Sequence, residues 1–181
     1  SVSRLGAGEL RLVGASHASE SLNRIAGVMI QRGSGQESLT AIRSPVLAGP
    51  GACGTFLVME DGMPIRPVGS CNVNELFEVD TGQAQSIEVV RGPGLALQGA
   101  NAVHGIVNVL SPTIDAPGPL RLSLEGGADD FRRLQLAAVT GSAADGYGAW
   151  GSFTHDGGFR AASPVEDGKL SLLHQRQWHG G

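Results

Sequence analysis

The chain has 181 residues, which is enough for one ordinary domain and part of another, or for two small domains. It contains 28 glycines and only 17% charged residues, a composition that favours turns and close backbone approaches over long helices. The net charge of −4 and the lack of a Lys/Arg run argue against nucleic acid as a partner, and no apolar run approaches the ~20 residues of a membrane helix.

Short strands and helical turns alternate over the first 111 residues. A short strand is predicted at residues 9–13, and a short helix with one apolar face is predicted at residues 19–26, where Gly27 would end it. Further strands are expected at residues 28–30, 38–43, 55–60, 83–91 and 106–110, with a helical turn at 73–79. The fold class predicted for this part is therefore α/β, a small mixed sheet with short helices.

The pattern changes at a proline-rich segment, residues 112–119, which we interpret as a linker. After it Leu120, Leu122 and Leu124 alternate with polar residues, the period of a strand with one apolar face. Similar strand-like segments follow at residues 134–140, 147–155 and 169–178, separated by turns rich in glycine and aspartate.

Strands of about ten residues with weak alternation are typical of an outer-membrane β-barrel. The aromatic residues expected at the membrane interfaces are Tyr147, Trp150 and Phe153. The segment 142–146 is short and the segment 156–168 is long, as expected for periplasmic turns and extracellular loops respectively. Four strands cannot close a barrel, so we expect a fragment; a small soluble sandwich is disfavoured because no second hydrophobic face is available.

One stretch combines a strand, a sharp turn at Arg91-Gly92-Pro93, a small-residue helical turn and a second β-branched strand at 106–109. Two other stretches precede it, Leu-Asn-Arg-Ile-Ala-Gly-Val at 22–28 and Phe-Leu-Val-Met-Glu-Asp-Gly-Met-Pro-Ile at 56–65. Together, and in this order, the three resemble the signature of the plug domain of TonB-dependent outer-membrane receptors. Ala26 stands where the family has proline, and Gln98 where an aromatic residue is common.

The resemblance implies a plug domain over residues 1–111, a linker over 112–119 and the first four strands of an incomplete outer-membrane β-barrel over 120–181. It further implies active uptake of a scarce nutrient, typically an iron–siderophore complex, across the outer membrane of a Gram-negative bacterium. The implied partners are TonB with its inner-membrane complex, a small-molecule ligand such as a ferric siderophore, and outer-membrane lipid. The alternative is a soluble periplasmic binding or interaction module that reuses the plug fold.

Two arginines, Arg43 and Arg91, end predicted strands. In the family the matching arginines lie at the boundary between plug and barrel and pair with barrel glutamates. A guanidinium left unpaired inside a lumen costs several kcal/mol, and its fork suits a bidentate carboxylate. The resemblance therefore implies a plug–barrel lock, although Ser44 replaces the family's glycine and makes the match at Arg43 the looser one. The alternative is an ordinary surface arginine at each position.

The loops at residues 44–54 and 66–74 resemble the family's apical loops, which contact substrate. Glycine and proline in the first loop would let the backbone approach a ligand closely, and an arginine in the second could meet an anionic one. The candidate substrate-binding residues are Gly49, Pro50, Gly51, Arg66 and Asn72.

The two cysteines, Cys53 and Cys71, lie in these loops. Two free buried thiols are one interpretation, whereas a zinc site would need more cysteine or histidine ligands at short spacing. The family resemblance implies an oxidising periplasmic location, where disulfides persist. We therefore predict a Cys53–Cys71 disulfide, whose closure would contribute roughly 3 kcal/mol in the chain-entropy model.

An enzymatic function would need a nucleophile beside a base. His104 stands alone among small residues, and no Gly-x-Ser-x-Gly elbow or equivalent accompanies it. A structural role is the simpler interpretation of this histidine. We expect no catalytic residue, no cofactor and no metal site.

Overall fold

The computed structural model describes residues 1–33, 35–46, 56–65, 74–98, 102–115, 117–160 and 163–178. The chain divides into two compact units, Ser1–Pro112 and Thr113–Gly181. Within the described residues, none of the helices combines the length and the apolar character that crossing a membrane requires.

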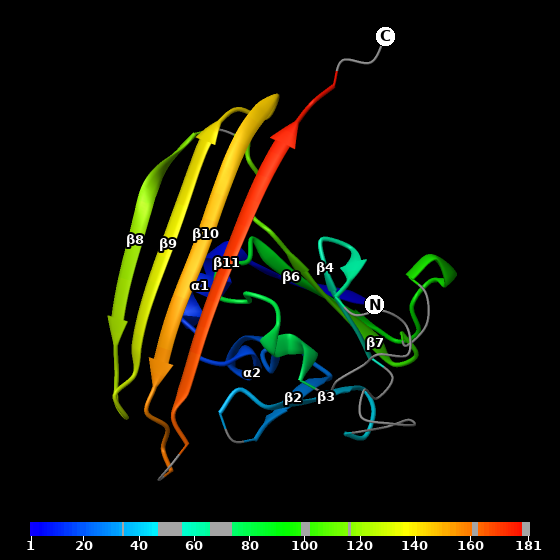
Figure 1. The fold of residues 1–181 in the computed structure, drawn as a ribbon. Coiled ribbons are helices and arrows are strands. Elements are labelled where there is room, and N and C mark those ends of the chain that lie inside the picture. The colour runs from blue at the N-terminus through cyan, green and yellow to red at the C-terminus, as the bar shows by residue number, and fades with distance from the viewer. Residues whose placement is uncertain are drawn as a thin grey trace. The chain divides into compact units, whose positions relative to one another are not determined.

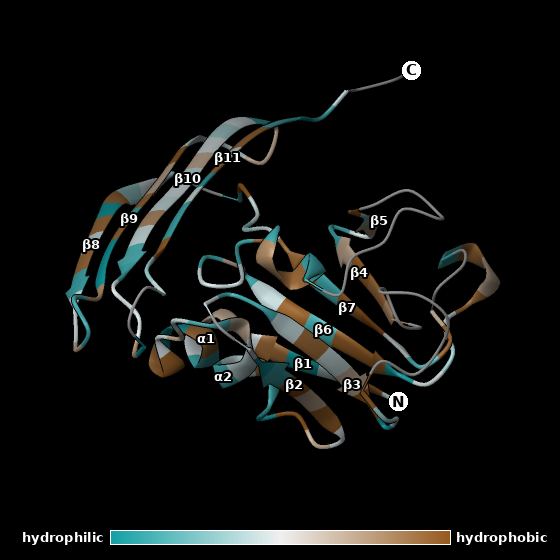
Figure 2. Cartoon of the chain, turned by 60° about the horizontal axis from the view of Figure 1, so that its bottom comes forward, coloured by the Kyte–Doolittle hydropathy of each residue, from teal (hydrophilic) through white to brown (hydrophobic). Residues whose placement is uncertain are grey.

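The first unit is built on a mixed five-stranded sheet with the strand order β1-β6-β7-β4-β5 (Figures 1 and 2). β4 and β7 pair in parallel, and the other neighbours pair antiparallel. The strands are β1 (Val2–Gly6), β4 (Phe56–Glu60), β5 (Met63–Pro64), β6 (Ser86–Arg91) and β7 (Gly105–Leu110). The mixed α/β sheet predicted from the sequence is confirmed.

A two-stranded ribbon and short helices complete this unit. The ribbon consists of β2 (Val28–Arg32) and β3 (Ser38–Ile42), which pair antiparallel. The α-helices are α1 (Ala7–Val13) and α2 (Ala18–Leu22), and the 3₁₀ turns are η1 (Glu75–Phe77) and η2 (Ala96–Gln98).

The sheet is covered on both faces, which explains the continuous apolar run in β4. Phe56 and Val58 belong to the main core, together with the fully buried Ile87 and Val107 of the neighbouring strands. Residues of the opposite parity form a smaller cluster on the other face, and its buried members are Leu57, Met59, Ala102 and Ile106. A strand buried on both faces needs apolar residues at successive positions rather than alternation.

The strand predicted over residues 9–13 is wrong, because this segment lies in helix α1. The Glu9 side chain accepts a hydrogen bond from the Gly6 N–H at 2.9 Å, and Gly14 ends the helix with φ of 57°. Leu10 and Leu12 are two positions apart, the spacing of residues on one face of a strand. Leu12 is 88% exposed, however, so the two leucines do not share a buried face. The helix predicted over residues 19–26 is also shorter than expected, since α2 ends at Leu22 and turns continue to Gly27.

The second unit is a four-stranded antiparallel sheet with the order β11-β10-β9-β8 (Figure 1). Its strands are β8 (Gly118–Gly126), β9 (Arg132–Gly141), β10 (Asp145–Asp156) and β11 (Val165–Arg176). The antiparallel strands predicted for residues 120–181 are thus confirmed, with β8 beginning two residues before Leu120.

The two faces of this sheet differ in chemistry. The pairs Leu122–Leu136 and Leu124–Leu134 place leucines of β8 and β9 on one face, where their side chains are exposed. On the other face Arg133 pairs with Glu125, with Nη2 and Oε2 2.5 Å apart. Figure 2 shows the resulting alternation of hydrophobic and hydrophilic colours along β8.

Trp150 does not lie on the apolar face with Tyr147 and Phe153, contrary to the interfacial role expected of it. Its position has the opposite parity, so its side chain extends from the other face of β10. The ring covers Gly148, where a Cβ atom would come within 2.1 Å of it, and Trp150 is only 6% exposed.

Candidate functional site

Arg43 and Arg91 lie far apart in the sequence but contact the same turn, the one that follows α2. The Arg91 guanidinium donates a hydrogen bond from Nη1 to the Ala26 carbonyl oxygen at 2.6 Å. The Arg43 backbone N–H donates to the Gly27 carbonyl oxygen at 2.9 Å. The ends of β3 and β6 therefore meet at two adjacent carbonyl groups, and this arginine–turn junction is the candidate site.

Position 27 favours glycine for two reasons, its backbone conformation and its close contact with the side chain of Arg43. Its φ of 80° lies in the left-handed region that favours glycine. A Cβ atom at this position would also meet Cγ of Arg43 at 3.2 Å, so the arginine side chain passes directly over the glycine. Arg43 itself has a φ of 51°, which is unusual for a residue other than glycine.

The direction of Arg91 is set by the sheet. Its backbone N–H donates to the Ser1 carbonyl oxygen at 2.9 Å, and the next N–H, that of Gly92, donates to the His104 carbonyl oxygen at 2.9 Å. Gly92 has a φ of 108°, as a sharp exit from the strand requires. Nε of Arg91 is buried and has no hydrogen-bond partner among the described residues, so the guanidinium is left with an unsatisfied donor.

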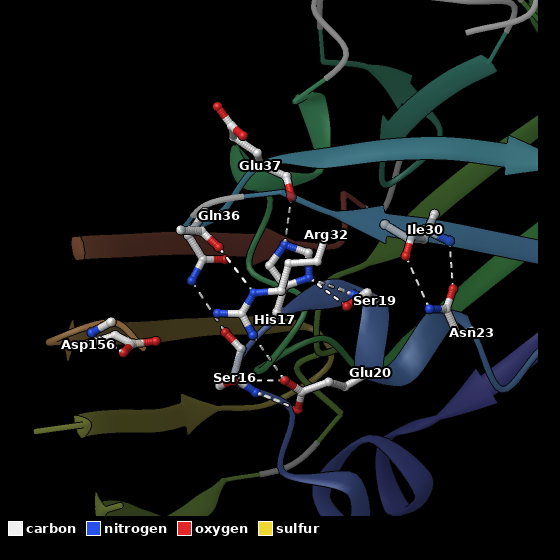
Figure 3. Close-up of polar contacts among 12 residues, drawn as sticks. Ser16, His17, Ser19, Glu20, Asn23, Ile30, Arg32, Gln36, Glu37 and Asp156 are labelled. Atoms are coloured by element: carbon white, nitrogen blue, oxygen red, sulfur yellow. Dashed lines mark hydrogen bonds and ion pairs between the residues drawn. The ribbon is translucent and has the colours of Figure 1, made fainter. Parts of the chain in front are cut away.

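The side chain of Asn23, which precedes the turn, is hydrogen-bonded to the backbone of Ile30, which follows it (Figure 3). Its Nδ2 donates to the Ile30 carbonyl oxygen at 3.1 Å, and its Oδ1 accepts from the Ile30 N–H at 2.6 Å. The side chain thus pairs with the Ile30 backbone as a residue of a neighbouring strand would. These two hydrogen bonds join the ends of the segment that contains Ala26 and Gly27. The sequence analysis missed this role because a bidentate contact over seven residues has no local periodicity.

A second group that the sequence analysis missed surrounds His17, which is only 3% exposed (Figure 3). Its Nδ1 accepts from the Ser19 N–H at 3.1 Å and caps α2, while Nε2 lies 3.2 Å from the Glu37 carbonyl oxygen, to which it donates. Burial lowers the pKa of His17, and the nearby Arg32 charge lowers it further against the opposing effects of two backbone carbonyls and Glu20. Glu20 itself accepts from the N–H and hydroxyl of Ser16.

The stability of the first unit should therefore fall as the pH falls through and below 6.5, the ordinary pKa of histidine. Its lowered pKa means that the unfolded chain binds a proton more readily than the folded chain, so acid favours unfolding. Urea unfolding followed by circular dichroism at about pH 7.5 and about pH 5 should show a lower midpoint in acid. His17→Asn keeps an acceptor at the cap without a titrating ring, and this part of the pH dependence should disappear; an unchanged pH dependence would contradict the assignment.

Two further titratable groups are His104, whose carbonyl oxygen lies beside the end of β6, and Glu60. His104 packs its ring against Phe56, with the ring centroids 5.9 Å apart, which agrees with a structural role. Burial, followed by the nearby Asp61 and Asp80, raises the pKa of Glu60. The strand pairing places Glu60 opposite Val109 and Arg91 opposite Gly105, at opposite ends of the sheet. In the described segments, no group of three His, Cys, Asp or Glu side chains is arranged to hold a metal ion.

The predicted apical contacts lie outside the described residues. This holds for all five candidate positions, Gly49, Pro50, Gly51, Arg66 and Asn72, and for Cys53 and Cys71. The substrate contacts stay predictions, and so does the disulfide, which gains no support from the structure.

Comparison with known proteins identifies the first unit. The family model of the TonB-dependent Receptor Plug Domain matches residues 1–106. The match covers more than half of the chain, so the chain belongs to this family, and the resemblance noted in the sequence is confirmed.

Solved structures extend the likeness to both units. The chain is similar to FpvA of P. aeruginosa bound to heterologous pyoverdines, with 17% identity and a TM-score of 0.69 over 86% of this chain and 20% of that one. It is similar to the siderophore receptor PirA from Pseudomonas aeruginosa, with 23% identity and a TM-score of 0.63 over 96% of this chain and 31% of that one. It is also similar to the copper transporter OprC, with 16% identity and a TM-score of 0.66 over 86% of this chain and 23% of that one. The chain thus spans between a fifth and a third of the length of these proteins.

Proposed function

We propose that the chain is the plug and the first barrel strands of an outer-membrane receptor that imports a scarce nutrient with energy supplied through TonB. The plug is assigned to residues 1–111, the linker to 112–119 and the barrel strands to 120–181. The observation that carries the proposal is the β8–β11 sheet, which follows a plug domain and has an exposed leucine face opposite an ion-paired face. A soluble periplasmic module would have no use for such an exposed apolar face.

The ligand class that we propose is a metal–chelator complex, with a ferric siderophore as the first choice. One of the similar structures is a complex with a pyoverdine and iron, a second is a siderophore receptor, and a third is a copper transporter. The residues proposed to contact the ligand are Gly49, Pro50, Gly51, Arg66 and Asn72. A glycine-rich backbone can approach a bulky chelate closely, and Arg66 can pair with its anionic groups.

We assign Arg43 and Arg91 to the plug–barrel lock. The Arg91 guanidinium supports the assignment, because it donates to one backbone carbonyl and has no carboxylate partner among the described residues, so it can bind a further acceptor. A carboxylate on the inner wall of the complete barrel would supply that acceptor and hold the plug in place. Since Arg91 and Arg43 both contact the Ala26–Gly27 turn, movement of the turn would disturb both lock residues together.

Uptake by the full-length receptor tests the function. Cells that lack their own siderophore receptors would express it, and accumulation of radioactive iron supplied with a panel of siderophores would be compared with accumulation of copper. We expect uptake of one ferric siderophore that disappears in a strain without TonB, and reduced uptake for Arg66→Ala. Equal accumulation with and without TonB, or recovery of the receptor in the soluble periplasmic fraction, would exclude the proposal.

The Cys53–Cys71 disulfide is a separate prediction about the apical loops. Oxidatively folded protein should gain about two daltons on reduction, and reduction should lower the urea midpoint because the closed loop contributes roughly 3 kcal/mol. Intact mass before and after reduction, with alkylation of any free thiols, measures this directly. Two thiols that react with iodoacetamide before reduction would show that the cysteines are free.

A further inference from the structure

A hollow of about 570 Å³ lies on the β8–β11 sheet, and its lining is mostly apolar. Its floor is formed by Ala138 and Ala149, which are register partners on β9 and β10. Larger side chains surround the two alanines, and the lining includes Leu120, Tyr147, Leu172 and His174. The hollow therefore forms where two small residues lie side by side among larger side chains.

Polar and aromatic groups gather at one end of this hollow. Tyr147 and His174 stack with their ring centroids 4.5 Å apart, and His174 Nε2 donates to Asp145 Oδ1 at 3.0 Å. Two residues further along β11, Arg176 lies over the ring of Trp178, with 4.8 Å from its Cζ to the ring centroid. Both Arg176 and Trp178 are exposed.

The charge at this end is available to an anion. Asp145 is the register partner of Arg176, but its carboxylate is engaged by His174. Within the described chain, the structure gives the Arg176 guanidinium a ring contact and no carboxylate partner. A guanidinium held on a tryptophan face keeps its N–H donors directed outward, where they can bind a phosphate.

We propose that this hollow binds one anionic phospholipid, with an acyl chain on Ala138 and Ala149 and the phosphate at Arg176. The volume lies within the range of small-molecule sites, and the apolar lining suits a hydrocarbon chain rather than a polar ligand. The basic and aromatic end lies beside the short turn between β9 and β10, and short turns mark the periplasmic side of outer-membrane barrels. The proposed lipid therefore belongs to the inner leaflet of the outer membrane. The assignment rests on the outer-membrane location proposed above.

Native mass spectrometry of the full-length receptor in mild detergent tests the site, with phosphatidylglycerol, phosphatidylcholine and lipopolysaccharide as probes. We expect preferential retention of phosphatidylglycerol and a loss of about fivefold in that retention for Arg176→Gln, the effect of one basic residue near an anionic lipid. Ala138→Leu fills the floor and should reduce retention of both phospholipids. Arg132→Gln is the matched control, because Arg132 lies on the same face at the other end of β9 and already pairs with Asp130. Retention of phosphatidylglycerol by this variant should equal that of the wild-type receptor.

Several outcomes would overturn the proposal. These are equal losses for Arg176→Gln and Arg132→Gln, retention that Ala138→Leu leaves unchanged, preference for lipopolysaccharide, or a receptor dimer that excludes lipid from this face. A receptor that stays in the outer membrane and imports its ligand but shows no lipid preference refutes the lipid site alone. A receptor found in the soluble fraction refutes the proposed function as well.

Discussion

Arg91→Ala in the full-length receptor should make cells more sensitive to antibiotics that the outer membrane normally excludes. The substitution removes the 2.6 Å hydrogen bond to the Ala26 carbonyl and the charge that we assign to the plug–barrel lock. Breaking a buried ion pair from one side costs about 3–5 kcal/mol, and less where water enters. The plug should therefore open more often, and both growth inhibition by the antibiotic and amide hydrogen exchange in β6 should increase.

Arg4→Ala provides the control for this experiment. Arg4 lies on the neighbouring strand β1, its side chain is 58% exposed, and its Nε is 4.0 Å from the Glu88 carboxylate. An exposed pair of this kind contributes little, so antibiotic sensitivity should stay near the wild-type value. Replacing the barrel partner of Arg91 as well should add little further damage, since the two residues share one interaction. Equal sensitivity of Arg91→Ala and Arg4→Ala would make Arg91 an ordinary surface arginine.

Gly105→Ala should strongly destabilise the first unit. A Cβ atom at the start of β7 would meet Cδ1 of Ile42 at 2.7 Å and the Val90 carbonyl oxygen at 2.8 Å. The first contact is with a fully buried side chain and the second with the backbone of β6, so neither can withdraw easily. Overpacking of this kind costs about 1–3 kcal/mol.

Urea unfolding of residues 1–112, followed by circular dichroism, measures the loss. Gly8→Ala is the matched control, because a Cβ atom in helix α1 would have no atom within 4 Å. Alanine in a helix interior is favoured over glycine by roughly 0.5–1 kcal/mol, so this variant should be neutral or slightly stabilised. A midpoint for Gly105→Ala that equals the wild-type value would show that β3 can move away from β7 without cost.

The strands that the sequence predicts best are those whose side chains are buried in a regular pattern. The continuous apolar run of β4 and the β-branched residues of β6 and β7 reflect a sheet covered on both faces. The leucine alternation of β8 reflects a sheet with one apolar face. β1 was missed because it lies at the sheet edge, where only Leu5 of its five residues is buried.

The candidate site could be predicted in its residues but not in its geometry. Family motifs locate Arg43 and Arg91, whereas their convergence on the Ala26–Gly27 turn depends on how β3 and β6 end in space. His17 could have been found by its place just before a helix, but histidine is a rare cap residue and its contact with Glu37 spans twenty positions.

The edge position of β1 has a mechanical consequence. β1 is held along one side by β6, and the residue pair just before the strand joins Ser1 to Arg91 through the Ser1 carbonyl and the Arg91 N–H. A pull at Ser1 directed away from the sheet loads this pair before any other, so the hydrogen bonds break one after another instead of sharing the load. Such peeling needs far less force than sliding the whole strand along its neighbour. The first backbone group that it would free is that of Arg91.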